Sequence, residues 1–167
     1  FSGSNPAAKF GRETEKSRDR ALTKGELISL TARLADKIET ENNPAIKKDQ
    51  RRLLDFILLA VLTGMRRGEI QGLRHGSDDI RIDDLENHVM LRDTKNGSDR
   101  YIPMGRIASE ILSRPFDFDY DPKRSFAKLC DDAKVKNLRF HDLRRSFATF
   151  LAGLGTDPFT IAGLLGH

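Results

Sequence analysis

The sequence predicts a mainly helical α+β domain, a helical bundle that carries a small three-stranded antiparallel sheet. Two observations lead to this fold class. Segments with apolar residues at helical spacing fill both halves of the 167-residue chain, whereas segments near the middle alternate apolar and polar residues. The order is therefore helices, a small sheet and helices again, with no internal repeat.

The composition is that of one soluble globular domain, with 38% hydrophobic and 32% charged residues. The longest apolar run, residues 56–62, is far shorter than the roughly 20 residues of a membrane helix. A net charge of +4 permits an anionic partner such as nucleic acid but does not identify one. The single cysteine, Cys130, excludes an internal disulfide, and we expect a reducing compartment.

The N-terminal part of the chain predicts a linker followed by a helix. Residues 1–20 are polar and lack an apolar period, which is typical of a linker. Thr23 and Glu26 have the spacing of a capping box that opens a helix. The apolar face of this helix would comprise Leu27, Leu30, Leu34 and Ile38. Residues 42–44, Asn-Asn-Pro, are expected to end it.

The middle of the chain predicts a buried helix and then the sheet. Residues 48–62 are apolar on several sides and should be central to the core. Gly64 breaks this helix, and a short helix through Ile70 follows. The three expected strands are 79–83, 88–92 and 100–103, the last two joined at the Asn96-Gly97 turn.

The remaining residues predict four more helices. The first two are expected at residues 106–112 and in a segment that ends near Ala133. The third begins around His141, with Leu143, Phe147, Phe150, Leu151 and Leu154 as its apolar stripe. We expect His141 and Arg144 to share the face opposite this stripe. Pro158 opens the last helix, which should run to the end of the chain.

Four separated segments carry residues that could do chemistry. They are residues 63–70, 94–97, 141–145 and 164–167. His141 and Arg144 stand at a helix start, which already favours anions. Arg66 follows a helix break and Lys95 sits at a hairpin tip, so both side chains can reach a ligand. Two arginines, a lysine and two histidines could neutralise a phosphodiester and donate protons to it.

Each of these residues also has an ordinary structural explanation, such as an ion pair, turn chemistry or a helix stop. The ordered combination is more specific, because the four segments together resemble the tyrosine recombinase (phage integrase) family over nearly the whole chain. The family's Thr-Gly-x-Arg-x-Gly-Glu segment matches Arg66, and its hairpin lysine matches Lys95. Its His-x-Leu-Arg signature matches His141 and Arg144, and its Leu-Gly-His segment matches His167.

The resemblance implies the catalytic domain of a site-specific DNA recombinase or integrase, with no metal or nucleotide cofactor. In that family a tyrosine hydroxyl attacks one strand of double-stranded DNA at an attachment site, which leaves a 3′-phosphotyrosyl link and a free 5′-hydroxyl. Arg66 and Arg144 would hold the non-bridging phosphate oxygens, and Lys95 would protonate the leaving oxygen. His141 and His167 would hydrogen-bond the phosphate, and His141 is also a candidate acceptor of the tyrosine proton.

Further residues have supporting roles by the same resemblance. Glu69 would support Arg66 through its carboxylate. Arg67, Arg145 and Arg100 are expected to contact the DNA backbone, whereas Asp142 is given no catalytic role. The stretches at residues 5–7 and 22–27 also resemble the joint between the family's N-terminal DNA-binding domain and its catalytic domain.

The nucleophile is the one departure from the family pattern. The family places its tyrosine about ten residues after the Leu-Gly-His segment, but this sequence stops at His167. Tyr101 and Tyr120 do not match that position. We therefore expect a linker at 1–20 from a missing N-terminal domain and a catalytic domain at 21–167 that lacks its nucleophile and is inactive alone.

The expected partners are DNA attachment sites and other protomers in a DNA-bound tetramer, with the 167-residue chain alone a monomer. A cytoplasmic, nucleoid-associated location in a prokaryote or a phage-infected cell fits this function. Two alternatives stay open. A type IB topoisomerase shares the constellation of residues but relaxes DNA without site preference, and a DNA-binding accessory module could carry the motifs without any reaction.

Overall fold

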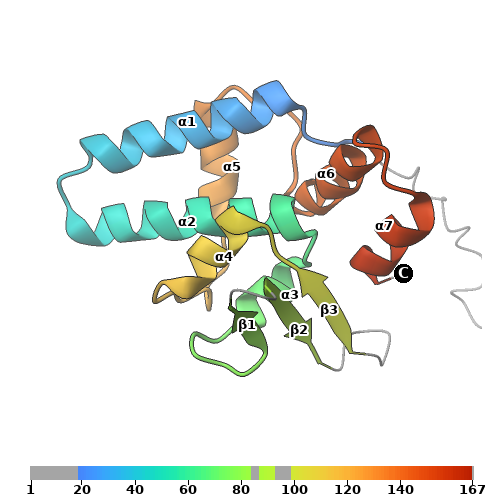
Figure 1. Ribbon diagram of the computed structural model, residues 1–167. Helices are drawn as coiled ribbons and strands as arrows, with labels where there is room; N and C mark the ends of the chain where they lie inside the picture. Colours follow the sequence, from blue (N-terminus) through green and yellow to red (C-terminus); the bar gives the residue numbers. More distant parts are fainter. Residues whose placement is uncertain (1–18, 84–86, 93–98, 167) are drawn as a thin grey trace, which may run out of the picture.

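The computed structural model describes residues 19–83, 87–92 and 99–166, which form seven helices and a three-stranded sheet (Figure 1). The elements are α1 (Lys24–Thr40), α2 (Pro44–Thr63), α3 (Arg67–Gly72), β1 (Ile80–Ile82), β2 (Asn87–Leu91), β3 (Arg100–Pro103), α4 (Arg106–Ser113), α5 (Lys123–Asp132), α6 (Phe140–Gly153) and α7 (Pro158–Leu165). The predicted fold class is confirmed: the domain is mainly helical, and the sheet is small and antiparallel.

Helices α1 and α2 form a hairpin, and a capping residue sets the start of each helix. The predicted capping box opens α1, with the Glu26 N–H donating to Thr23 Oγ1 at 3.2 Å. Helix α2 begins at Pro44 and not near residue 48 as expected. Asn43 Oδ1 accepts from the Ala45 N–H at 3.0 Å, and proline suits the first helical turn, so the Asn-Pro pair starts a helix as well as ending one.

Helix α2 is the centre of the core, as the sequence predicted. It packs against α1, α4 and α6, and Figure 1 shows it running through the middle of the helical layer. Phe56, Ile57 and Leu59 are fully buried on it. The Phe56 ring lies edge-on to Phe118 and Phe140, with ring centres 5.6 and 5.2 Å apart. Segments distant in the sequence therefore meet at this helix.

The sheet has the order β1-β2-β3, and its buried face is set by strand alternation. Val89 of β2 lies opposite Ile102 of β3, and both are buried. Within β3, Arg100 and Ile102 are buried whereas Tyr101 is 61% exposed. The strand therefore points the Arg100 side chain into the domain. The predicted Asn96-Gly97 turn lies outside the described residues.

The expected faces of α6 are corrected by the structure. Arg144 is buried, as Leu143 is, because α6 packs against α2 and also against α7. His141 is exposed and Arg144 is buried, but both side chains line one pocket, as their expected common face implies. Leu154, predicted to belong to the apolar stripe, is 79% exposed because it caps the helix in the turn before α7.

Gly64 ends α2 at a position where any side chain would be strained and crowded. Its φ of 67° lies in the left-handed region. A Cβ at this position would stand 2.5 Å from Phe147 Cδ1 and 2.9 Å from Leu165 Cδ2. Helices α6 and α7 therefore approach the backbone of this turn directly.

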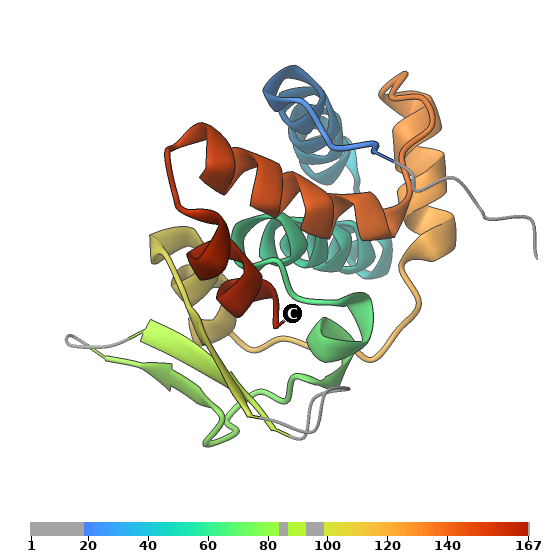
Figure 2. The ribbon, with the colours of Figure 1, turned by 90° about the vertical axis from the view of Figure 1, so that its right-hand side faces the viewer.

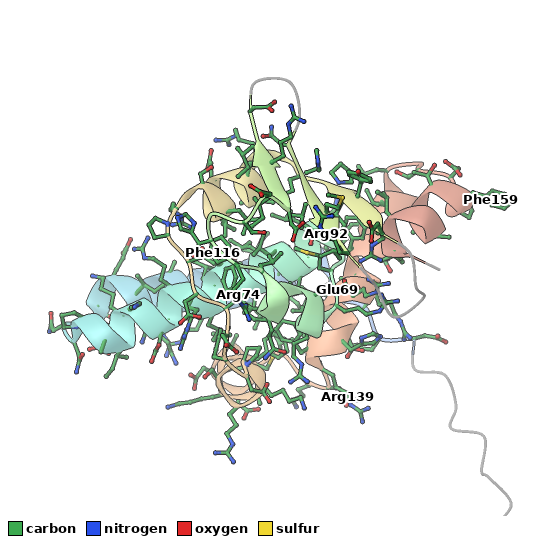
Figure 3. The ribbon with its side chains drawn as sticks, turned by 90° about the horizontal axis from the view of Figure 1, so that it is seen from below. Glu69, Arg74, Arg92, Phe116, Arg139 and Phe159 are labelled. Carbon is green, nitrogen blue, oxygen red and sulfur yellow. The ribbon has the colours of Figure 1, made fainter. Side chains whose placement is uncertain are left out.

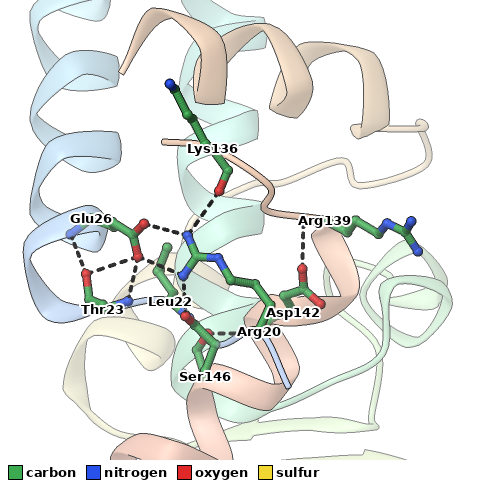
Figure 4. A network of polar contacts seen from close by, with 9 residues as sticks. Arg20, Leu22, Thr23, Glu26, Lys136, Arg139, Asp142 and Ser146 are labelled. Carbon is green, nitrogen blue, oxygen red and sulfur yellow. Dashed lines mark hydrogen bonds and ion pairs between the residues drawn. The ribbon is translucent and has the colours of Figure 1, made fainter. Parts of the chain in front are cut away.

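The chain before α1 is fastened to the rest of the domain by polar contacts (Figure 4). Arg20 donates to Glu26 Oε2 at 2.9 Å and to the Lys136 carbonyl at 3.3 Å. The Leu22 N–H donates to Ser146 Oγ at 2.7 Å, which ties this segment to α6. Residues 1–18 of the predicted linker lie outside the described residues, whereas Arg20 is part of the domain packing.

Two further expectations concern the whole chain. Among the described residues, no helix combines the length and apolar character needed to cross a membrane. Cys130 is buried and unpaired, and burial raises the pKa of its thiol to about 11. The thiol is therefore protonated at neutral pH and a poor nucleophile.

We predict that Gly64→Ala destabilises the domain by about 3 kcal/mol, because the new Cβ combines left-handed strain with overpacking against Phe147. Urea unfolding measures this loss. Gly76→Ala is the matched control: its φ is 76°, but nothing lies within 4 Å of the added Cβ. It should cost only the strain, about 1–2 kcal/mol. Equal losses in the two variants would contradict the proposed close packing at Gly64.

We predict that the stabilising effect of Glu26 is lost in acid. Its hydrogen bond with Arg20 lowers the pKa of the carboxyl to about 2. A carboxyl with a lowered pKa in the folded state stabilises at neutral pH, and the effect fades as the pH falls from about 4.5 to about 2. Unfolding free energies of the wild type and Glu26→Gln should differ at pH 7 and converge near pH 2. Glu110→Gln, at an exposed pair, should differ little from wild type throughout.

Candidate active site

The candidate site is built around the carboxylate of Glu69, in the first turn of α3. The turn at Gly64 leads through the buried Met65 to Arg66, which has an extended backbone and stands directly before the helix. Glu69 Oε2 accepts from the Arg66 backbone N–H at 2.6 Å, and Oε1 accepts from Arg66 Nη1 at 2.8 Å. Both backbone and side chain of Arg66 are thus held by one carboxylate.

Two further guanidinium groups converge on the same carboxylate from distant parts of the chain. Arg100 Nη2, from β3, donates to Glu69 Oε2 at 2.8 Å. Arg144 Nη1, from α6, lies 4.0 Å from the same oxygen. We call Glu69, Arg66, Arg100 and Arg144 the arginine cluster. Figure 3 places Glu69 well inside the outline of the domain, whereas the side chains of Arg139 and Phe159 extend outward.

Helix ends supply the remaining acceptors of the arginine cluster. Arg144 Nη1 donates to the Gly64 carbonyl at 2.6 Å, just beyond the end of α2. Arg144 Nη2 and Arg100 Nη1 both donate to the Leu165 carbonyl at the end of α7. Carbonyls at helix C-termini lack partners within the helix and carry partial negative charge, so they suit guanidinium groups. Figure 2 shows α7 ending beside β3 and α3.

The arginine cluster is electrostatically unbalanced. Three guanidinium groups around one carboxylate leave two positive charges uncompensated. Burial, followed by repulsion from Arg66, lowers the pKa of Arg144 to about 10. Burial also lowers the pKa of Arg100, opposed by the charge of Glu69. Holding these positive charges together therefore destabilises the folded protein, and a bound anion would stabilise it.

A pocket of about 550 Å³ opens beside the arginine cluster. Its lining comprises Met65, Arg66, Arg67, Lys123, Phe126, Ala127, Leu138, Arg139, Phe140, His141 and Arg144. Three of the residues with a predicted catalytic role, Arg66, His141 and Arg144, therefore face one space. This lining has no acidic side chain but several basic ones, which makes the pocket suitable for an anionic group with an apolar part. A second pocket of about 520 Å³ shares Arg66 and contains Glu69.

The other predicted site residues have different surroundings. Arg67 lines the first pocket and forms an ion pair with Asp121 at 2.8 Å. Arg145 is half-buried, and its Nη1 has no hydrogen-bond partner among the described residues. Asp142 is buried, and its carboxylate accepts from the Arg139 N–H at 2.8 Å, which is a capping role. Lys95 and His167 lie outside the described residues, as does the rest of the turn at residues 93–98.

Sequence reasoning missed two features of the site. It treated Glu69 as a partner of Arg66 alone, although the carboxylate is shared with Arg100 and lies near Arg144. It also placed Arg100 at the DNA surface, whereas the structure buries its guanidinium. Strand alternation was a usable signal, since Arg100 and the apolar Ile102 share one face of β3.

Metal binding has no obvious place among the described residues. They include no group of three His, Cys, Asp or Glu side chains arranged to hold a metal ion. The polar groups that converge on the pocket are donors, which suit an anion.

Comparison with known proteins places this fold and these motifs in a family. No protein-family model matches the sequence. The chain is 30% identical over 166 residues to a putative integrase/recombinase of Haemophilus influenzae, covering 93% of the chain and 51% of that relative. It is 27% identical over 192 residues to the tyrosine recombinase XerA of Saccharolobus solfataricus, covering 94% of the chain and 63% of that protein.

The chain belongs to the tyrosine recombinase (integrase) family. Its fold matches solved tyrosine recombinases and integrases. The catalytic domain of bacteriophage HP1 integrase superposes with a TM-score of 0.62 at 18% identity, covering 88% of this chain and 80% of that one. The Tn1549 transposon integrase in complex with circular intermediate DNA gives 0.64 at 20% identity, covering 93% and 59%. The chain spans less than two thirds of the length of the relatives that it matches in sequence.

We predict that Glu69→Gln destabilises the domain by about 3–5 kcal/mol, because the buried guanidinium groups of Arg100 and Arg144 lose their charged neighbour. Sulfate should raise the melting temperature of the variant more than that of the wild type, since a bound dianion replaces the lost charge. Thermal unfolding in sodium sulfate and in sodium chloride of equal ionic strength measures both effects. Glu110→Gln should show neither, and equal sulfate responses in all three proteins would contradict anion binding at the cluster.

Proposed function

We propose that this chain acts as the catalytic domain of a site-specific DNA recombinase or integrase that cuts and rejoins strands through a 3′-phosphotyrosyl intermediate. The observation that carries the proposal is the convergence of Arg66, His141 and Arg144 on one pocket that has no acidic lining residue. A phosphodiester is anionic and gains charge when a nucleophile adds to phosphorus. A fixed excess of positive charge stabilises that gain without rearrangement of the protein.

The proposed roles follow from position and chemistry. Arg66 and Arg144 hold the two non-bridging oxygens, and Glu69 keeps the Arg66 guanidinium turned toward the pocket. His141, at the exposed start of α6, hydrogen-bonds the phosphate and is a candidate to accept the tyrosine proton. From the family resemblance, Lys95 gives a proton to the leaving 5′-oxygen and His167 adds a hydrogen bond. Neither step uses a metal or a nucleotide.

The nucleophile is proposed to come from outside the 167 residues. Tyr120 packs edge-on to Phe56, and Arg52 lies over its ring at 4.0 Å. Its hydroxyl is buried without a partner among the described residues, and burial raises its pKa, so the phenolate is disfavoured. Tyr101 points to the face of β3 opposite Arg100 and contacts His88. These surroundings support a nucleophile other than Tyr101 or Tyr120.

The proposed domain division and partners extend the same argument. Residues 1–20 join the domain to an N-terminal DNA-binding part, and residues 21–167 hold the phosphate. Double-stranded DNA is the substrate, and Arg67 and Arg145 are proposed to contact its backbone. Further protomers assemble on the DNA into a tetramer, whereas the 167-residue chain alone is a monomer and, without a nucleophile, inactive.

We predict that the full-length protein forms a covalent adduct with a nicked suicide DNA substrate and that Arg144→Lys and Arg144→Ala slow this step about 10²–10³-fold. Binding to the same DNA should fall much less, because a single phosphate contact is lost among many. Single-turnover gel assays measure the adduct, and melting temperatures verify folding. Arg106→Gln, an exposed residue paired with Glu110, is the control and should behave as wild type.

The other outcomes distinguish the remaining functions. A wild-type protein that binds DNA strongly and never forms an adduct would contradict the proposal and favour a DNA-binding accessory module. Adduct formation with relaxation of any supercoiled plasmid, independent of sequence, would favour a topoisomerase. Adduct formation only at an attachment site supports the recombinase.

A further inference from the structure

Arg100 has an environment unlike that of a DNA-binding arginine. It is the first residue of β3, and its side chain is 8% exposed. Nη2 donates to Glu69 Oε2 at 2.8 Å, and Nη1 donates to the Leu165 carbonyl. Its Nε is buried with no partner among the described residues. It does not line the pocket that Arg66 and Arg144 share. The guanidinium therefore faces the protein interior.

Each acceptor of Arg100 is shared with one of the two arginines proposed to hold phosphate. The Glu69 carboxylate that Arg100 contacts also binds the backbone and guanidinium of Arg66. The Leu165 carbonyl that Arg100 contacts also accepts from Arg144 Nη2. Arg100 thus links α3 to the end of α7. Its two hydrogen bonds fix the separation between the Glu69 carboxylate, which orients Arg66, and the Leu165 carbonyl, which orients Arg144.

The shape of the guanidinium matters as much as its charge. Its planar fork can present two N–H groups to two acceptors of fixed separation, which a lysine ammonium reproduces only in part. The turn after α7 lies close to the guanidinium, because a Cβ on Gly166 would stand 2.5 Å from Arg100 Nη1. Gly166 has a φ of 69°, so the turn after α7 lies directly on the Arg100 side chain.

We propose that Arg100 is a positioning residue of the phosphate site and makes no contact with DNA. The inference rests on the proposed function and adds a division of labour to it. Arg66 and Arg144 bind the phosphate, whereas Arg100 holds the Glu69 carboxylate and the Leu165 carbonyl so that both guanidinium groups meet at one place. This orientation explains why the Arg100 guanidinium is buried beside two other positive charges.

The experiment uses the full-length protein, with Arg100→Gln and Arg100→Lys compared with wild type and Arg106→Gln. Single-turnover formation of the covalent adduct should slow about 10–100-fold in Arg100→Gln, since small misplacement of binding groups is costly. Arg100→Lys should recover part of the rate, because the ammonium reaches one of the two acceptors. The dissociation constant for DNA should change about twofold or less in both variants.

Two further measurements separate positioning from other roles. Loss of a phosphate contact reduces the slope of log K against log salt by about 0.9, so an unchanged slope supports positioning and a reduced slope overturns it. In a Glu69→Gln background, Arg100→Gln should slow the reaction less than it does in the wild-type background, because one of the two acceptors of Arg100 is the same carboxylate. Full additivity would overturn the proposal.

Failure of the inference is distinct from failure of the proposed function. If the wild type forms no adduct, the proposed function fails, and the inference fails with it. If the wild type reacts and both Arg100 variants react as fast, only the inference fails. Melting temperatures are recorded for each variant, and Arg100→Lys carries the test if Arg100→Gln does not fold. A fully active Arg100→Lys would then overturn the need for a two-pronged donor.

Discussion

One carboxylate holds the site together. Glu69 is the negative group around which Arg66, Arg100 and Arg144 gather, and those three residues come from the turn before α3, from β3 and from α6. Without this carboxylate, three positive charges would lie close together with little contact with water, which would strongly destabilise the fold. With it, the charges are retained but not neutralised. The fold thus keeps a net positive charge at the arginine cluster, where α3, β3 and α6 come together.

Helix ends complete this arrangement. The Gly64 and Leu165 carbonyls accept from the buried arginines, and each lies at a turn in which a glycine takes a left-handed conformation. These turns expose the last carbonyls of α2 and α7 and let neighbouring side chains come close. The glycine after α2 is therefore a site residue as much as a helix stop. Its backbone supplies an acceptor, and its missing side chain admits the packing of α6 and α7.

The sequence was informative where local rules decide the structure. Capping at Thr23, the helix break at Gly64 and the apolar character of α2 follow from short-range chemistry, and all three were predicted. The start of α2 was placed too late because Asn43 and Pro44 serve both as an end and as a beginning. The sharing of Glu69 and the burial of Arg100 depend on contacts between residues 31 or more apart, which residue types alone do not give. The roles of Arg66, Lys95, His141, Arg144 and His167 came from motif resemblance and stay predictions.

The attachment of residues 20–22 has a mechanical consequence. The Leu22 N–H is bonded to Ser146 of α6, and Arg20 reaches both α1 and the loop at Lys136. Tension applied to the chain ahead of Arg20 would load α6 as well as α1, at a point about one and a half turns beyond the helix start that bears His141. Because the segment before α1 is bonded to the helix that bears Arg144, a pull on this segment would act on α6 and not only fray the start of α1.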